Sequence, residues 1–176
     1  MSAPASAPVG WAILAPVISI NVLGVDEWRV WRELRLAALA DAPGAFRSTY
    51  AYWSGEGDTE ANWRDRLAGR PLNLVLVLNA DNAGMVSAAG PDDDGTVGLH
   101  SMWVAPFARG TGVADAAIGA VIEWSGRQDA RAVELCVMAT NEAAMRLYRR
   151  HGFVVQGAHA DHCDELVMRR PGNLAP

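Results

Sequence analysis

The sequence predicts a single domain built around a mixed α/β sheet, an α+β-like arrangement, and three observations lead to this fold class. The 176 residues fit one domain, and 51% of them are apolar, which is enough for one sizeable core. Strand-like runs joined by short turns occupy the middle of the chain. Strand-like runs that alternate with amphipathic helices follow. This order favours a mixed sheet over a doubly wound parallel sheet or a barrel.

The first elements are a short strand and two helices. Residues 18–23 predict a short strand. Asp26 is a suitable N-cap for a helix that extends through Ala40, because its apolar side chains recur at helical spacing. Thr59 is a suitable N-cap for the second helix. We expect loop or irregular helix between them.

Three strands joined by turns come next. Residues 72–78 form a nearly continuous aliphatic strand. The Asp-Asn-Ala-Gly sequence at 81–84 is turn chemistry, so residues 85–89 are expected to pair back as a hairpin. After an acidic turn, residues 96–104 predict the third strand.

The last part of the chain alternates strands and helices. An apolar stripe over 113–124 predicts a long helix, and strand 133–138 and helix 141–150 follow. Residues 153–155 and 165–168 are expected to be the last two strands. The predicted element order is therefore β-α-α-β-β-β-α-β-α-β-β.

Composition sets the domain limits and excludes some partners. We expect residues 1–16 to be a disordered tail, 17–170 the domain, and 171–176 a C-terminal tail. The net charge of −5 argues against nucleic acid and anionic membranes as partners. The apolar run over 9–25 is interrupted by polar residues and is too short to predict a membrane span.

The two cysteines do not make a disulfide framework. A reducing, cytoplasmic location is therefore the simplest expectation. Cys136 lies in an apolar run and predicts a buried thiol.

The segment from Val104 to Asp115 carries the strongest chemical signal. A strand ends, and a Gly-rich turn opens directly into a helix, whose first N–H groups form an anion site. Gly110 and Gly112 let the backbone approach phosphate oxygens, and Arg109 adds positive charge. The dinucleotide fingerprint fails because Asp115 stands at its third glycine, and the P-loop pattern is absent. An ordinary Gly-rich turn is the alternative interpretation.

Two motifs give the chain a family resemblance. Arg109-x-x-Gly112-x-Ala114 resembles the Q/R-x-x-G-x-G/A signature of the GNAT superfamily of acyl-CoA-dependent N-acyltransferases. Residues 101–106 resemble the strand before that signature, and 141–153 resemble a second motif, N-x-x-A-x-x-L-Y-x-x-x-G-F. The resemblance covers about residues 18–168.

The resemblance implies a GNAT fold with a splayed central sheet and acetyl-CoA as co-substrate, without a metal. The splay falls between strands 96–104 and 133–138 and leaves the backbone of Met102, Trp103 and Val104 free to pair with the pantetheine amides. The implied phosphate loop consists of Arg109, Gly110, Thr111, Gly112, Val113 and Ala114. Asn141 and Ala144 are implied to lie along the CoA arm, and Tyr148 near the sulfur.

The resemblance also implies direct attack of a neutral amine on the thioester. Tyr148 would protonate the departing thiolate; a core tyrosine is the alternative. Many relatives place a Glu base where this chain has Gly98, so the base is open. His100 lies on the same strand face, and an ordinary pKa of about 6.5 suits a base. Backbone carbonyls with water, or a histidine that only packs, are the alternatives.

The acceptor is the least specified part. Tyr50 and Trp53 are the predicted acceptor contacts. The first acceptor class is a small-molecule amine such as an antibiotic, a polyamine or an amino acid; a protein N-terminal or lysine amine is the second. A non-catalytic acyl-CoA-binding module is a further alternative. His159, His162 and Cys163 match no zinc spacing and predict a turn. The oligomeric state stays open, with a homodimer as one option.

Overall fold

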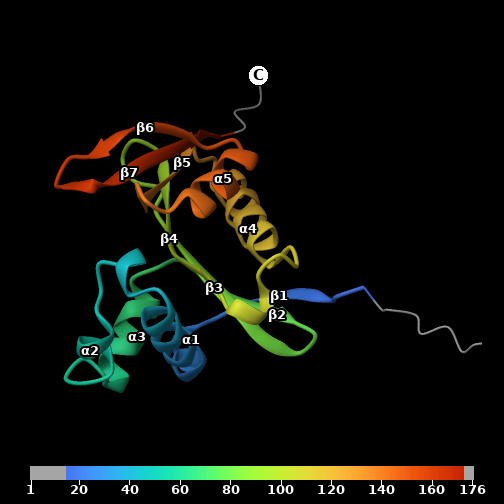
Figure 1. Ribbon diagram of the computed structural model, residues 1–176, viewed down its shortest axis with the longest axis vertical. Coiled ribbons are helices and arrows are strands. Elements are labelled where there is room, and N and C mark those ends of the chain that lie inside the picture. Colours follow the sequence, from blue (N-terminus) through green and yellow to red (C-terminus); the bar gives the residue numbers. More distant parts are fainter. Residues whose placement is uncertain (1–14, 173–176) are drawn as a thin grey trace, which may run out of the picture.

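The computed structural model describes residues 15–172 and contains one seven-stranded sheet in the order β1-β2-β3-β4-β5-β7-β6 (Figure 1). All neighbouring strands are antiparallel except β4 and β5. The predicted mixed α/β sheet and element order are confirmed. Most of the tail expected over 1–16, and the chain end beyond residue 172, lie outside the described residues. No helix of the described part is long and apolar enough to cross a membrane.

The first four strands form one half of the sheet. They are β1 (Ile18–Val22), β2 (Leu72–Leu78), β3 (Asp81–Ala89) and β4 (Thr96–Val104). The side chains of β2 alternate between two cores: Leu74 and Leu76 belong to one, and Val75 to the other. Helices cover both faces of this half, which explains the continuous aliphatic sequence of β2.

One face is covered by α1 (Trp28–Asp41) and α3 (Glu60–Ala68) (Figure 1), and the single turn α2 (Tyr50–Trp53) comes between them in the sequence. Trp31 of α1 and Trp63 of α3 are fully buried in this core. As predicted, Thr59 caps α3, where its side chain accepts a hydrogen bond from the backbone N–H of Asn62.

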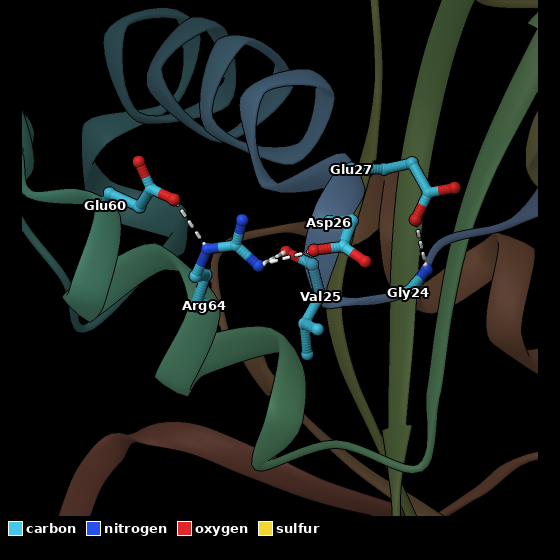
Figure 2. A network of polar contacts seen from close by, with 6 residues as sticks. All are labelled: Gly24, Val25, Asp26, Glu27, Glu60 and Arg64. Carbon is cyan, nitrogen blue, oxygen red and sulfur yellow. Dashed lines mark hydrogen bonds and ion pairs between the residues drawn. The ribbon is translucent and has the colours of Figure 1, made fainter.

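The start of α1 corrects the prediction for Asp26. The chain first forms a short 3-10 helix, η1 (Val25–Glu27), in which the Glu27 carboxylate accepts from the N–H of Gly24 (2.8 Å) (Figure 2). Asp26 instead accepts from Arg64 of α3 at 2.7 Å, and Arg64 also pairs with Glu60 (Figure 2). Asp26 therefore ties the entry of α1 to α3, a tertiary role that helical spacing does not reveal.

The other face is covered by α4 (Val113–Arg127), and the second half of the sheet carries α5 (Glu142–Arg150) (Figure 1). Its strands are β5 (Ala132–Met138), β6 (Val154–His159) and β7 (His162–Pro171). The last two are longer than predicted because β6 and most of β7 are only partly buried, so their sequences lack an apolar run. β7 also passes the predicted domain end at residue 170.

β4 and β5 pair only over a short stretch and then part. Their register consists of Thr96 with Ala132, Val97 with Val133, and Gly98 with Glu134. A bulge in β4 follows: Ser87 of β3 faces His100, whereas Met85 faces Trp103, so β4 carries one extra residue. Ser101 in this bulge has a φ of 55°. Bulges bend and twist a strand, so β4 turns away from β5 at this bulge.

Candidate active site

A cleft of about 1020 Å³ opens where β4 and β5 separate. Its walls come from β4, β5, the turn before α4, and one side of α5. Met102, Trp103 and Val104 border it. Beyond Gly98, the edge of β4 that faces β5 has no strand partner among residues 15–172. The backbone groups of this edge, apart from the Val104 carbonyl, which accepts a hydrogen bond from Arg109, are therefore available to an extended ligand.

The start of α4 forms one end of the cleft. Gly112 is its N-cap with a φ of 94°, and Gly110 has a φ of 77°. These left-handed conformations strain residues that carry a Cβ, which explains both glycines. Within the described chain, no well-formed hydrogen bond is donated by the backbone N–H groups of residues 110–115. Together with the helix dipole they form an anion site.

Val113 and Thr111 anchor this turn to the protein through their side chains. The Val113 side chain is fully buried in the core, and the Thr111 hydroxyl donates to the carbonyl of Ala108 at 2.6 Å. Gly110, Gly112 and Ala114 border the cleft. The turn is thus anchored by side chains that point away from the cleft, while its N–H groups stay free.

The guanidinium of Arg109 is bound by groups of the protein itself. Its guanidinium pairs with Asp41 at the end of α1 and donates from Nε to the carbonyl of Val104 (3.2 Å). Asp41 also accepts from the indole of Trp103 at 2.9 Å, and hydrogen bonds from Trp103 and Arg109 lower the pKa of this carboxyl. Because its charge is shared with a carboxylate, Arg109 offers less to a phosphate than its position in the sequence predicts.

α5 brings three predicted residues to the opposite wall. Asn141 is the N-cap, and its side chain accepts from the N–H of Ala144 (3.1 Å); both residues border the cleft. Tyr148 is buried against Phe153 with ring centroids 5.8 Å apart, and it also borders the cleft. Burial raises the pKa of Tyr148 well above its ordinary value. The phenol is therefore neutral at every physiological pH.

His100 occupies the space next to Gly98. A Cβ placed on Gly98 would lie 2.6 Å from Nε2 of His100, so a side chain at residue 98 and this imidazole exclude each other. His100 is exposed to the cleft but surrounded by protein atoms and arginines. Burial, followed by Arg70, Arg66 and Arg47, lowers the pKa of His100 to about 4. The pKa of His100 in the folded protein is therefore lower than the ordinary value of about 6.5.

Comparison with known proteins decides the family. The model of the acetyltransferase (GNAT) family matches residues 31–153, well over half of the chain. The chain belongs to this family. Its fold is similar to that of the PaiA N-acetyltransferase from Thermoplasma acidophilum, solved with coenzyme A, with a TM-score of 0.72 at 13% identity over 88% of this chain and 99% of that one. The splayed sheet is thus a GNAT fold.

Relatives with more sequence identity cover less of the chain. The N-acetylaspartate synthetase of Danio rerio is 36% identical over 97 residues, and the human protein of that name is 38% identical over 88 residues. These matches take in 55% and 50% of this chain, and it spans about a third of those relatives (34% and 29%). Nourseothricin acetyltransferase is 28% identical over 57% of this chain and 64% of that chain, with a TM-score of 0.54.

Two residues expected to contact the acceptor lie elsewhere in this GNAT domain. Neither Tyr50 nor Trp53 borders the cleft. Tyr50 is 46% exposed on α2, and Trp53 stacks on Trp63 (4.4 Å between centroids) beneath the guanidinium of Arg66. Trp53 packs on α3 and lines a separate hollow of about 330 Å³ that shares Arg66 and Arg70 with the cleft.

Cys136 also differs from its prediction. It is exposed and borders the cleft, whereas its neighbours Leu135 and Val137 point into the core. The strand alternation of β5 is normal, but the splay leaves one face of the strand uncovered. The prediction of a buried thiol was wrong because the sequence does not reveal which face of β5 is left uncovered where β4 and β5 part.

The far end of the cleft holds residues that the sequence analysis missed. Arg35, Arg47, Arg66 and Arg70 all border it. These arginines belong to α1, to the α1–α2 loop, and to α3 and the residues that follow it, so only the folded structure shows that they lie close together. His159 also borders the cleft, at the predicted turn between β6 and β7. Across residues 15–172, no three His, Cys, Asp or Glu side chains come close enough to hold a metal ion.

Proposed function

We propose that the protein transfers the acetyl group of acetyl-CoA directly to a primary amine of a small molecule. One observation carries this proposal: the free N–H groups at the start of α4 and the side chains of Tyr148 and His100 belong to the same cleft. An anion site for the CoA phosphates and two proton-transfer candidates are thereby joined by the open edge of β4.

The residues that line this cleft suit the successive parts of acetyl-CoA. The N–H groups of residues 110–115 would receive the pyrophosphate, because two left-handed glycines leave them uncovered. The unpaired edge over Met102, Trp103 and Val104 would receive the pantetheine amides in the manner of an added strand. The thioester would then lie near Tyr148, and Asn141 and Ala144 border the same cleft.

The two side chains divide the proton transfers. His100 is unprotonated at neutral pH and accepts a proton from the attacking amine, directly or through water. Arginines near the imidazole disfavour its cation, so His100 passes the proton on to solvent. Tyr148 stays neutral and donates its hydroxyl proton to the departing thiolate of CoA. The amine nitrogen gains the acetyl group as the carbon–sulfur bond breaks.

A small acceptor is favoured by the closure of the cleft. Arg47 of the α1–α2 loop forms a bidentate pair with Glu165 of β7, at 3.2 and 2.6 Å. This contact bridges the route along which a peptide would lie between that loop and the β6–β7 hairpin. The names of N-acetylaspartate synthetase and nourseothricin acetyltransferase also point to small molecules as acceptors of similar proteins.

The test is acetyl-CoA-dependent thiol release over a panel of small amines and N-terminal and lysine peptides, with the product identified by mass spectrometry. We expect release with at least one small amine and none above background with peptides. Preferred turnover of peptides would replace the small-molecule proposal by a protein acceptor. Tight CoA binding without thiol release from any amine would favour a non-catalytic acyl-CoA-binding module.

A further inference from the structure

Arg35, a buried arginine that borders the cleft, has no counter-ion among the described residues. Arg35 of α1 is 3% exposed, and its Nε and Nη1 are buried without a hydrogen-bond partner among the described residues. Its guanidinium lies over the ring of Phe46, 4.3 Å from the centroid. A buried charge without a counter-ion is unfavourable for folding, so this arrangement is costly unless a ligand supplies the missing negative charge.

A second arginine intensifies the positive charge. Arg66 of α3 is close enough to Arg35 to lower its pKa, which burial and Arg66 together bring to about 9. Nε of Arg66 is buried without a partner, and its Nη2 donates to the hydroxyl of Ser101 in the β4 bulge (3.3 Å). Arg66 and Arg70 also lower the pKa of His100. Arg66 and Arg70 therefore lie near His100, and Arg66 lies between this histidine's strand and Arg35.

The part of the chain that the structure describes supplies no carboxylate for these groups. Among residues 15–172, no Asp or Glu lies within 4.0 Å of Arg35, Arg66 or Arg70. Each acidic residue that borders the cleft has another partner: Asp92 with backbone N–H groups, Asp115 with Arg150, Glu134 with Arg169, and Glu165 with Arg47.

We propose that the acceptor is an amine that carries a carboxylate, and that this carboxylate binds at the guanidinium groups of Arg35 and Arg66, which places the amine beside His100. The inference rests on the proposed function, since it names the substrate class of that same site. A guanidinium matches a carboxylate in charge and fork geometry. An amino acid supplies both the carboxylate that the arginines bind and the amine that is acetylated, whereas a polyamine supplies only the amine.

The first experiment compares amino acids with their amides. Aspartate, glutamate, glycine and β-alanine are each assayed, by acetyl-CoA-dependent thiol release, against the form in which every carboxylate is amidated. Amidation removes the negative charge and lowers the pKa of the amine, so the amide has more of the reactive neutral form. We nevertheless expect at least one acid to exceed its amide in kcat/KM by at least about tenfold.

The variants are Arg35→Met and, as a control on the same helix, the exposed Arg29→Met. For Arg35→Met we expect KM for the acid to rise at least about tenfold, with the affinity for CoA unchanged. Its melting temperature should be no lower than that of the wild type, because an uncompensated buried charge is removed. A purely structural Arg35 would instead lower the melting temperature and impair turnover of acids and amides alike.

A binding measurement separates this inference from the proposed function. In the presence of CoA, the acid should raise the melting temperature of the wild type and of Arg29→Met but not of Arg35→Met. If that shift occurs while no amine releases thiol, the carboxylate site stands and the catalytic proposal fails. If uncharged amines are acetylated as well as acids are, or no acid shifts the melting temperature, the carboxylate site is overturned.

Discussion

Arg47 and Glu165, which are 118 residues apart in the chain, form a bidentate ion pair across the mouth of the cleft. Arg47 follows α1 and belongs to the first half of the fold, whereas Glu165 belongs to β7 in the second half. The pair therefore connects the two halves of the sheet on the side where β4 and β5 have separated.

Breaking this pair should widen the acceptor entrance. We expect Glu165→Gln, which retains Arg47, to raise kcat/KM for large amines relative to small ones. Stability should change little, by roughly 0.2–1 kcal/mol, because Arg47 is half exposed. The control Glu142→Gln breaks the exposed pair with Arg146. An unchanged ratio of large to small acceptors would remove the pair from acceptor selection.

The phosphate turn is tested by a pair of glycine substitutions on α4. Gly112→Ala places a Cβ on a left-handed residue and displaces the free N–H groups, so we expect CoA to bind at least about tenfold more weakly, or about 1.4 kcal/mol, by calorimetry. Gly119→Ala lies within the same helix with open space around its Cβ, and it should leave CoA binding unchanged. Equal CoA affinity in a folded Gly112→Ala variant would refute the phosphate site.

Tyr148→Phe isolates the hydroxyl, because the ring that packs on Phe153 is kept. If Tyr148 is the proton donor, kcat should fall at least about tenfold while CoA affinity changes little. The raised pKa of Tyr148 further predicts that its deprotonation produces no basic limb in the kcat profile below pH 10. Full kcat in Tyr148→Phe would assign the protonation of the thiolate to solvent.

His100 makes a prediction about acid. Its pKa is lowered to about 4 in the folded protein, first by burial and then by Arg70, Arg66 and Arg47. A His100 base would therefore give kcat, at saturating acceptor, an acidic limb with a midpoint near 4 that is absent in His100→Gln. A limb with the same midpoint in the variant would show that another group is the base.

The same pKa links His100 to stability. Below about pH 6.5 the unfolded chain protonates this histidine, whereas the folded protein does so only near pH 4. Stability is thus fully present above pH 6.5 and decreases as the pH falls toward 4. Urea unfolding at pH 7, 5.5 and 4.5 should show a smaller loss for His100→Gln than for the wild type. Equal losses would contradict the lowered pKa.

Local signals in the sequence predicted much of the fold. The aliphatic run of β2, the cap at Thr59 and the glycine-opened start of α4 each depend on neighbours within a few residues. For the same reason the motifs located the turn at residues 110–115 and the position of Tyr148 on α5. The chemistry assigned to them stays a prediction.

Features set by distant contacts were not predicted. The role of Asp26 depends on Arg64, and the exposure of Cys136 depends on where β4 leaves β5. Trp53 lies away from the cleft because its partner is Trp63. Arg35 lies on the buried face of α1. Helical spacing alone does not show whether the charged end of such an arginine stays buried or extends to solvent.

The parting of β4 and β5 has a consequence for the exchange of backbone amides. Within residues 15–172, only three residue pairs join β4 to β5, so few backbone hydrogen bonds hold the two halves of the sheet together at this seam. An extended ligand seated along β4 would act as a missing strand and close the seam. Amide hydrogen exchange along β4 and β5 should therefore slow when CoA binds, while exchange between β2 and β3 stays the same.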